Sequence, residues 1–204
     1  MSTLTEERRL KALAFGMPYG LLGSARALSD ESSELIKGFS VIARRAAAGA
    51  IALELAYALQ KGDEDEKRLF YRDKSRNYGV DPSLTQYEMG LFHGENTEHD
   101  LDVIVQSKEA LGMLMWMLGG HASPIDPTLP MKVEEVVRMM NEAGNIQTFI
   151  ERAQVVDFED IMVMLDLYRL YDEENVGDKT IVHYRRQALE WLITSENDWL
   201  RVPV

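Results

Sequence analysis

The stretch Ala46–Leu59, AAAGAIALELAYAL, decides the fold of this chain. Its residues Ile51, Leu55 and Leu59 recur at the spacing of one helix face, and its alanines let neighbouring helices approach closely. Glu54 interrupts the run, which also falls short of the roughly 20 apolar residues that a membrane-spanning helix needs. The sequence therefore predicts a buried helix at the centre of the protein.

Outward from this helix, apolar residues keep a helical period almost everywhere, and few segments alternate as a strand would. We expect an all-α fold, an irregular multi-helix bundle of roughly seven to nine helices without a significant sheet. Ser83 with Gln86 resembles a capping box, and Thr97 with Asp100 opens a helix that runs to Leu118. Residues 1–204 are expected to form a single globular helical domain.

The clearest interruption of the helical pattern is the proline-rich loop 119–130. It begins with two glycines and contains Pro124, Pro127 and Pro130. Proline lacks an N–H donor and disfavours helix in the residue before it. The loop is therefore a connection between helices or a possible subdomain boundary.

Composition narrows the classes of partner. With 34 acidic and 22 basic side chains the chain carries a net charge of -12, which opposes binding to nucleic acid or to an anionic membrane. Cysteine is absent, which excludes disulfides and thiolate chemistry and suits a reducing compartment. The N-terminal stretch lacks the apolar core of a secretory signal, so a cytoplasmic location is expected. No cofactor is predicted.

The densest group of potential metal ligands is His93, Glu95, Glu98, His99 and Asp100, with His121 further along, and its candidates are His93, Glu95 and His99. Imidazole and carboxylate together suit zinc or iron. The two histidines are six residues apart across an expected loop, unlike an H-E-x-x-H helix in which both share one face. We therefore favour exposed loop histidines over a metal site.

Two adjacent arginines near the C-terminus, Arg185 and Arg186, lie in a helical segment rich in apolar residues. Neighbouring helix positions project about 100° apart, so at least one arginine is expected to point inward. A buried guanidinium needs a carboxylate, and Asp166 or Glu159 on the preceding helix is the expected partner. The alternative is a ligand-binding site between the last two helices, with the candidate residues Asp166, Tyr168, Arg169, Arg185, Arg186 and Trp191.

A series of short motifs gives the chain a family resemblance. In order they are ARRA at 43–46, LTQYE at 84–88, EALGMLMWMLG at 109–119, DLYRL at 166–170 and RRQALEWL at 185–192. This series resembles the bacterial domain-of-unknown-function family numbered 4272, from about Ile42 to the C-terminus. The resemblance implies an all-helical fold and carries over no activity. The resemblance implies departures in two motifs, because Tyr171-Asp172 stands where the family has a His-Trp pair and Glu190 where it has an asparagine.

Two classes of function follow. The first is a non-catalytic interaction module that binds a basic protein, because the chain is acidic and lacks a recognisable catalytic motif. Eight carboxylates fall between Asp157 and Lys179, which fits such a docking face or simply a solvated acidic face. The eleven methionines also suit core packing or a homo-oligomer interface. The second class is a small-molecule-binding protein or hydrolase-type enzyme, with an Arg/Asp/Tyr site between the last two helices. We favour the first.

Overall fold

The computed structural model describes residues 4–22, 37–61 and 64–204, and every regular element in these ranges is a helix. The all-α prediction is confirmed. The α-helices are α1 (Leu4–Gly16), α2 (Phe39–Leu59), α3 (Glu64–Tyr78), α4 (Gln86–His93), α5 (Glu98–Gln106), α6 (Lys108–Met117), α7 (Val133–Ala143), α8 (Ile146–Arg152), α9 (Phe158–Glu173) and α10 (Lys179–Leu192). The 3-10 turns are η1 (Met17–Tyr19), η2 (Asp81–Ser83) and η3 (Trp199–Arg201).

Helix α2 is buried, as its sequence predicts, but it lies at the centre of one half of the molecule and not of the whole. It contacts α3, α4, α5, α6, α7 and α8, and its alanine-rich face is buried. Gly49 permits the close approach of α6, because a Cβ atom at this position would lie 2.3 Å from Leu111 Cδ2. A small-residue helix therefore forms the hub around which longer side chains pack.

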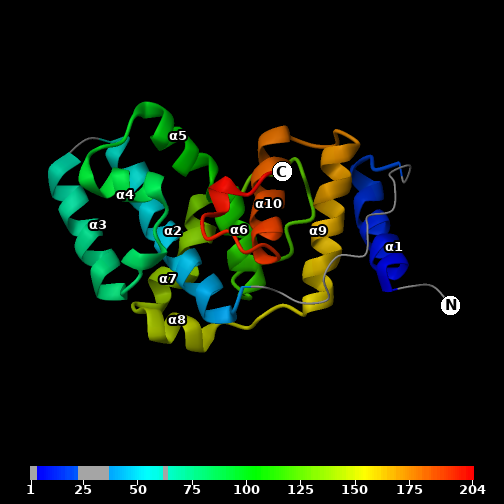
Figure 1. Ribbon diagram of the computed structural model, residues 1–204, viewed down its shortest axis with the longest axis horizontal. Helices are drawn as coiled ribbons and strands as arrows, with labels where there is room; N and C mark the ends of the chain where they lie inside the picture. The colour runs from blue at the N-terminus through cyan, green and yellow to red at the C-terminus, as the bar shows by residue number, and fades with distance from the viewer. Residues whose placement is uncertain (1–3, 23–36, 62–63) are drawn as a thin grey trace.

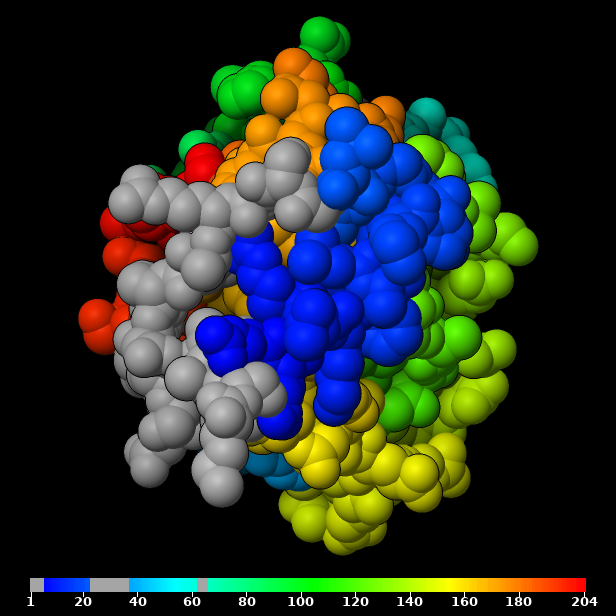
Figure 2. Space-filling model, turned by 90° about the vertical axis from the view of Figure 1, so that its right-hand side faces the viewer, coloured from blue at the N-terminus to red at the C-terminus, as the bar shows by residue number. Residues whose placement is uncertain are grey.

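Helix α6 joins this half to the other one. It packs on α2 and on α10, α10 packs on α9, and α9 packs on α1. Figure 1 shows the resulting row, from α1 at one end through α9, α10, α6 and α2 to α3 at the other. Figure 2 views the α1 end, where α1 lies across the outside of α9.

Two local predictions needed correction. The helix expected from Thr97 to Leu118 is divided into α5 and α6 at Ser107, whose hydroxyl donates to the carbonyl of Ile104 at 2.7 Å. The capping box of α4 is formed by Thr85 and Glu88. Ser83 instead belongs to η2, because Pro82 favours a tight turn before the helix begins.

Other sequence signals coincide with the structure. Thr97 and Asp100 form the predicted capping box at the start of α5. The loop 119–130 connects α6 to α7, and both helices pack on α2. In the part of the chain that the structure describes, no helix combines the length and the apolar character needed to cross a bilayer.

Candidate functional site

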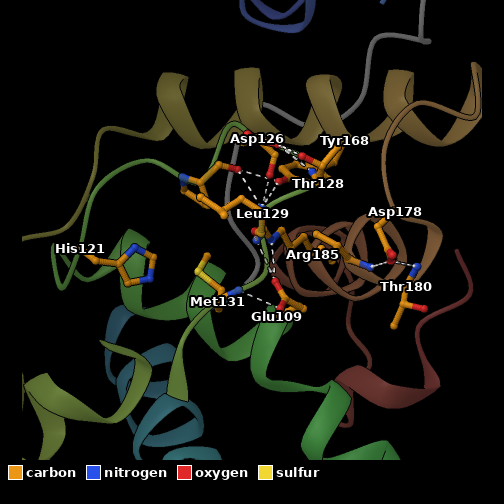
Figure 3. Close-up of polar contacts among 12 residues, drawn as sticks. Glu109, His121, Asp126, Thr128, Leu129, Met131, Tyr168, Asp178, Thr180 and Arg185 are labelled. Atoms are coloured by element: carbon orange, nitrogen blue, oxygen red, sulfur yellow. Dashed lines mark hydrogen bonds and ion pairs between the residues drawn. The ribbon is translucent and has the colours of Figure 1, made fainter. Parts of the chain in front are cut away.

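Arg185 of α10 is the centre of a buried polar cluster (Figure 3). Only 1% of its side chain is exposed, and it faces Glu109 of α6, which is 3% exposed. Its Nε and Nη2 atoms donate to Glu109 Oε2 at 3.0 and 2.8 Å. The prediction that one of the two arginines points inward is confirmed. The expected partner was wrong, because Glu109 rather than Asp166 or Glu159 neutralises Arg185.

The remaining donors of Arg185 hold the proline-rich loop. They reach the carbonyl oxygens of Asp126 at 2.8 Å and Leu129 at 2.6 Å, and the Tyr168 hydroxyl at 2.7 Å. Tyr168 in turn donates to the carbonyl of Pro124 at 2.6 Å. Loop carbonyls that have no helical partner are thus satisfied by one guanidinium.

Both carboxylate oxygens of Glu109 accept hydrogen bonds from within the chain. Its second carboxylate oxygen, Oε1, accepts the backbone N–H of Met131 at 2.9 Å, at the end of the loop. All N–H groups of Arg185 have acceptors within the chain, so none is left for a ligand. Burial raises the pKa of Tyr168 to about 12, and the phenol stays a neutral donor. The cluster is a clamp between α6, α9, α10 and the loop.

The neighbouring arginine, Arg186, lies at the surface. It pairs with Asp172, and its Nε lies 3.4 Å from Glu190 Oε1. Glu190 is also bound in bidentate fashion by Arg169, through two 2.7 Å bonds. The structure thus brings two carboxylates, Asp172 and Glu190, to Arg186.

The other predicted site residues do not join this group. Glu159 forms a bidentate pair with Arg8 at 2.7 Å, and this contact lowers the Glu159 pKa. Asp166 is buried near Arg8 and helps to raise the pKa of that guanidinium. Trp191 is buried, with the Lys37 ammonium 5.2 Å from the centre of its ring. The candidate residues thus serve several separate contacts instead of one cleft.

Most carboxylates of the acidic segment between Asp157 and Lys179 also have structural partners. Asp157 and Asp178 cap α9 and α10. Glu174 accepts the backbone N–H of Leu22 at 2.8 Å. Together with the pairs of Glu159 and Asp172, these contacts make the segment a poor candidate for a continuous docking face.

Sequence reasoning missed a second buried ion pair. Arg45 of α2 meets Glu88 of α4, and each side chain is 3% exposed. Arg45 also donates to the Ser83 carbonyl and lies under Trp199, with 5.0 Å from its guanidinium carbon to the ring centre. The motif residues Arg45, Glu88, Glu109 and Arg185 therefore form two clamps. The signal was present, since each pair joins two of the quoted motifs.

An open groove lies between α4, α5 and η3, with a volume of about 640 Å³. Its acidic lining residues are Glu95, Asp100 and Asp198. Tyr87 and Met89 of α4 also line it, and they are 39% and 44% exposed. The groove thus combines carboxylates with apolar surface, and we call it the α4–α5 groove.

The carboxylates of this groove differ in environment. Hydrogen bonds from the backbone and side chain of Thr97 lower the Asp100 pKa and favour its charged form. Burial raises the Asp198 pKa, and the nearby Glu88 adds to this effect. Arg201 lies at the edge, 3.8 Å from Asp198 Oδ2, and donates to Gln86 at 3.0 Å. The charge of the lining is negative in sum.

The three residues considered as metal ligands, His93, Glu95 and His99, are not arranged as a metal centre. His93 and Glu95 line the groove, and His99 lies beside Asp100, whose pKa it helps to lower. Within residues 4–22, 37–61 and 64–204, no three His, Asp or Glu side chains converge as metal ligands. The geometry brings His93 to a groove wall instead.

Comparison with known proteins assigns the chain to a family. The family model described as Domain of unknown function (DUF4272) matches residues 22–202, and the chain belongs to this family. No curated protein and no solved structure matches the chain. The family resemblance seen in the motifs is confirmed, and helix α1 lies before the matched region.

Proposed function

We propose that this member of the DUF4272 family is a non-catalytic binding module that receives a basic segment of a partner protein in the α4–α5 groove. The observation that carries the proposal is the lining of the groove. Glu95, Asp100 and Asp198 surround exposed surface from Tyr87 and Met89. A segment with lysine or arginine beside an apolar side chain complements both features.

The overall charge of the chain supports the same class of partner. A net charge of -12 attracts basic segments over a distance set by the ionic strength, about 10 Å at 0.1 M salt. It repels nucleic acid, which we do not propose as a ligand. Since the chain has no cysteine, a reducing compartment suits it, and we propose that it acts in the cytoplasm.

The contacts of Arg185 favour binding over catalysis. A substrate-binding arginine needs free donors and access from solvent, whereas Arg185 is buried and its donors are occupied within the chain. Tyr168 is held between Arg185 and the Pro124 carbonyl. These contacts count against a hydrolase site between the last two helices.

A labelled peptide tests the proposal directly. The probe is a short peptide that alternates lysine with leucine, and its binding to the full chain is measured by fluorescence anisotropy. The double variant Glu95→Gln/Asp198→Asn should weaken binding about tenfold, since two partly exposed charge pairs at about 0.7 kcal/mol each are lost. Binding of the unaltered protein should also weaken as salt is raised.

The matched control is Glu134→Gln/Glu142→Gln on α7, which removes the same charge from exposed positions outside the groove. This variant should bind the peptide almost as well as the unaltered protein. Equal losses in the two variants would assign binding to net charge and reject the groove. A peptide with glutamate in place of lysine should not bind, and comparable binding of this peptide would also reject the proposal.

A further inference from the structure

A small cavity of about 100 Å³ lies between α3, η2 and α4. Its polar lining comes from Arg72, Ser75 and Arg76 of α3, Asp81 of η2 and His93 of α4. We call it the Arg72 pocket. This pocket is separate from the clamp around Arg185. A ligand bound in it would occupy a second site, in addition to the proposed peptide groove.

Arg72 has an unusual position in this pocket. Its Nε atom is buried, and among the described residues it has no hydrogen-bond partner. A buried charged donor without an acceptor is costly, so such groups in folded proteins are normally satisfied by the protein, by water or by a bound ion. Arg72 also lines the pocket, where it shares the polar wall with Ser75 and Arg76.

The fixed charges of the pocket are unbalanced. Arg72 and Arg76 contribute two positive charges, against one negative charge from Asp81. Asp81 is already engaged, since it accepts the Ser75 hydroxyl and its other oxygen lies 4.0 Å from Arg76 Nε. Arg76 is 61% exposed and its second carboxylate neighbour, Asp73, is 3.8 Å away. Among the lining residues alone, positive charge exceeds negative charge, which contrasts with a chain whose net charge is -12.

The size and the walls of the pocket restrict what could supply a negative charge. Leu84, Met89 and Phe92 form its apolar side, and Phe92 is buried in the core. A volume of about 100 Å³ holds a few water molecules or one small oxyanion. Guanidinium groups match the oxygen spacing of phosphate and carboxylate, and arginine is the residue most used for them.

We propose that the Arg72 pocket binds a single phosphate-like oxyanion, held by the guanidinium groups of the two arginines in its lining, Arg72 and, on the outer side, Arg76. Met89 and His93 line both this pocket and the α4–α5 groove. The oxyanion therefore has two sources, free phosphate or a phosphorylated side chain of a segment in the groove. The chemistry of recognition is the same for both.

The test follows the Arg72 Nε–Hε signal by nuclear magnetic resonance while inorganic phosphate is added to the full chain in a phosphate-free buffer. This signal is identified by its loss in Arg72→Lys. We expect it to shift along a saturable curve. Arg72→Gln should weaken phosphate binding at least tenfold, followed through the backbone signals of α4. Arg138→Gln on α7 should leave binding unchanged, since Arg138 is exposed outside the pocket and the same charge is lost.

Two results would overturn the proposal. One is an Arg72 signal whose shift rises linearly with phosphate concentration and equals the shift caused by chloride. Such a result would indicate charge screening alone. The other is an equal loss of phosphate binding in Arg72→Gln and Arg138→Gln, which assigns the effect to net charge. The fold of each variant is checked by circular dichroism, and Arg72→Lys, which keeps the charge, shows whether the guanidinium itself is needed.

A second titration distinguishes the sources. The lysine–leucine peptide is compared with the same peptide carrying one phosphoserine. Tighter binding of the phosphopeptide that is lost in Arg72→Gln supports an oxyanion supplied by the partner. Saturation by free phosphate without any gain for the phosphopeptide supports a free ion. Binding of free phosphate is measured without peptide. A failure of the phosphate proposal can therefore be distinguished from a failure of the peptide-groove proposal.

Discussion

Arg185 and Arg72 differ in how their buried donor atoms are satisfied. Arg185 is saturated by a carboxylate, a phenol and loop carbonyls, and it ties α10 to α6, α9 and the proline-rich loop. Arg72 has a buried Nε without a partner among the described residues, beside a small pocket. Burial of a donor atom therefore does not by itself show that the donor is satisfied.

The largest expected effect is at the Arg185 clamp. Arg185→Met should lower the free energy of unfolding by about 3–5 kcal/mol, since it leaves Glu109 buried and uncompensated. Urea denaturation followed by circular dichroism measures the loss. The double variant Arg185→Met/Glu109→Leu should recover part of it, because an apolar pair can replace a buried ion pair. A single variant as stable as the unaltered protein would contradict the clamp.

A slightly smaller loss is expected at the second clamp. Arg45→Met should cost about 3 kcal/mol, since Glu88 remains buried while only one loop carbonyl, that of Ser83, loses its donor. The neighbouring Arg44 is exposed and donates to the Gly79 carbonyl at 3.2 Å. Arg44→Met is therefore the control and should stay within about 0.5 kcal/mol of the unaltered protein. Equal losses in the two variants would argue against a buried pair.

Tyr168 is expected to make the stability of the folded protein decrease at alkaline pH. Burial raises its pKa to about 12, above the ordinary value of about 10. The unfolded chain loses this proton first, so the stability contributed by the neutral phenol is complete below pH about 10 and is lost as pH rises toward 12. Urea midpoints measured across this range should fall.

The variant Tyr168→Phe sharpens this prediction. It should cost about 1–2 kcal/mol near neutral pH, through the hydrogen bonds to Arg185 and the Pro124 carbonyl. It should also reduce the alkaline decline, leaving the part contributed by Tyr171 and Tyr184, whose pKa values burial raises as well. Tyr87→Phe in the exposed groove serves as the control and should keep the decline. An unchanged decline in Tyr168→Phe would assign the alkaline transition to other groups.

Arg186 tests whether the loss of stability on removing an arginine depends on how deeply its ion pair is buried. It follows Arg185 directly in the sequence, yet its side chain is 22% exposed and its partner Asp172 is 49% exposed. Arg186→Gln should cost less than about 1 kcal/mol, since Glu190 keeps its bidentate pair with Arg169. Thermal unfolding at low and high salt measures the loss. A loss as large as that of Arg185→Met would contradict this ranking.

The smallest effect on stability is expected at Arg72. Arg72→Met removes an unsatisfied buried donor and should leave stability within about 0.5 kcal/mol or raise it slightly in phosphate-free buffer. The comparison with Arg185→Met is made in the same urea experiment. A loss above about 2 kcal/mol would mean that Arg72 already has a strong partner and would remove the contrast.

Much of the fold could be predicted from local patterns. The central helix follows from the spacing of Ile51 and Leu55, and the start of α5 follows from Thr97 and Asp100. Helix α3 is not revealed by an apolar face, since it is mostly charged and leaves Leu69 and Phe70 exposed. Periodicity detects helices that bury one side in a core, and α3 has only a narrow side of this kind.

The candidate sites were harder to predict from the sequence than the fold. The sequence indicates that one of the adjacent arginines turns inward, but it places the partner on the preceding helix. The observed partner, Glu109, is 76 residues away in the sequence. Likewise, Asp198 meets residues of α4 and α5 in the groove only because the C-terminal segment folds back on them.

By itself the sequence determined the helical class, the central helix, the family and the acidic charge, because each depends on composition or on neighbours within a few residues. The tertiary structure decided which carboxylate meets Arg185, which residues line the α4–α5 groove and that Arg72 Nε lies buried without a partner. The physical reason is that ion pairing and burial depend on how helices far apart in the chain pack. Helical periodicity fixes the face on which a side chain lies, but not the helix that it meets.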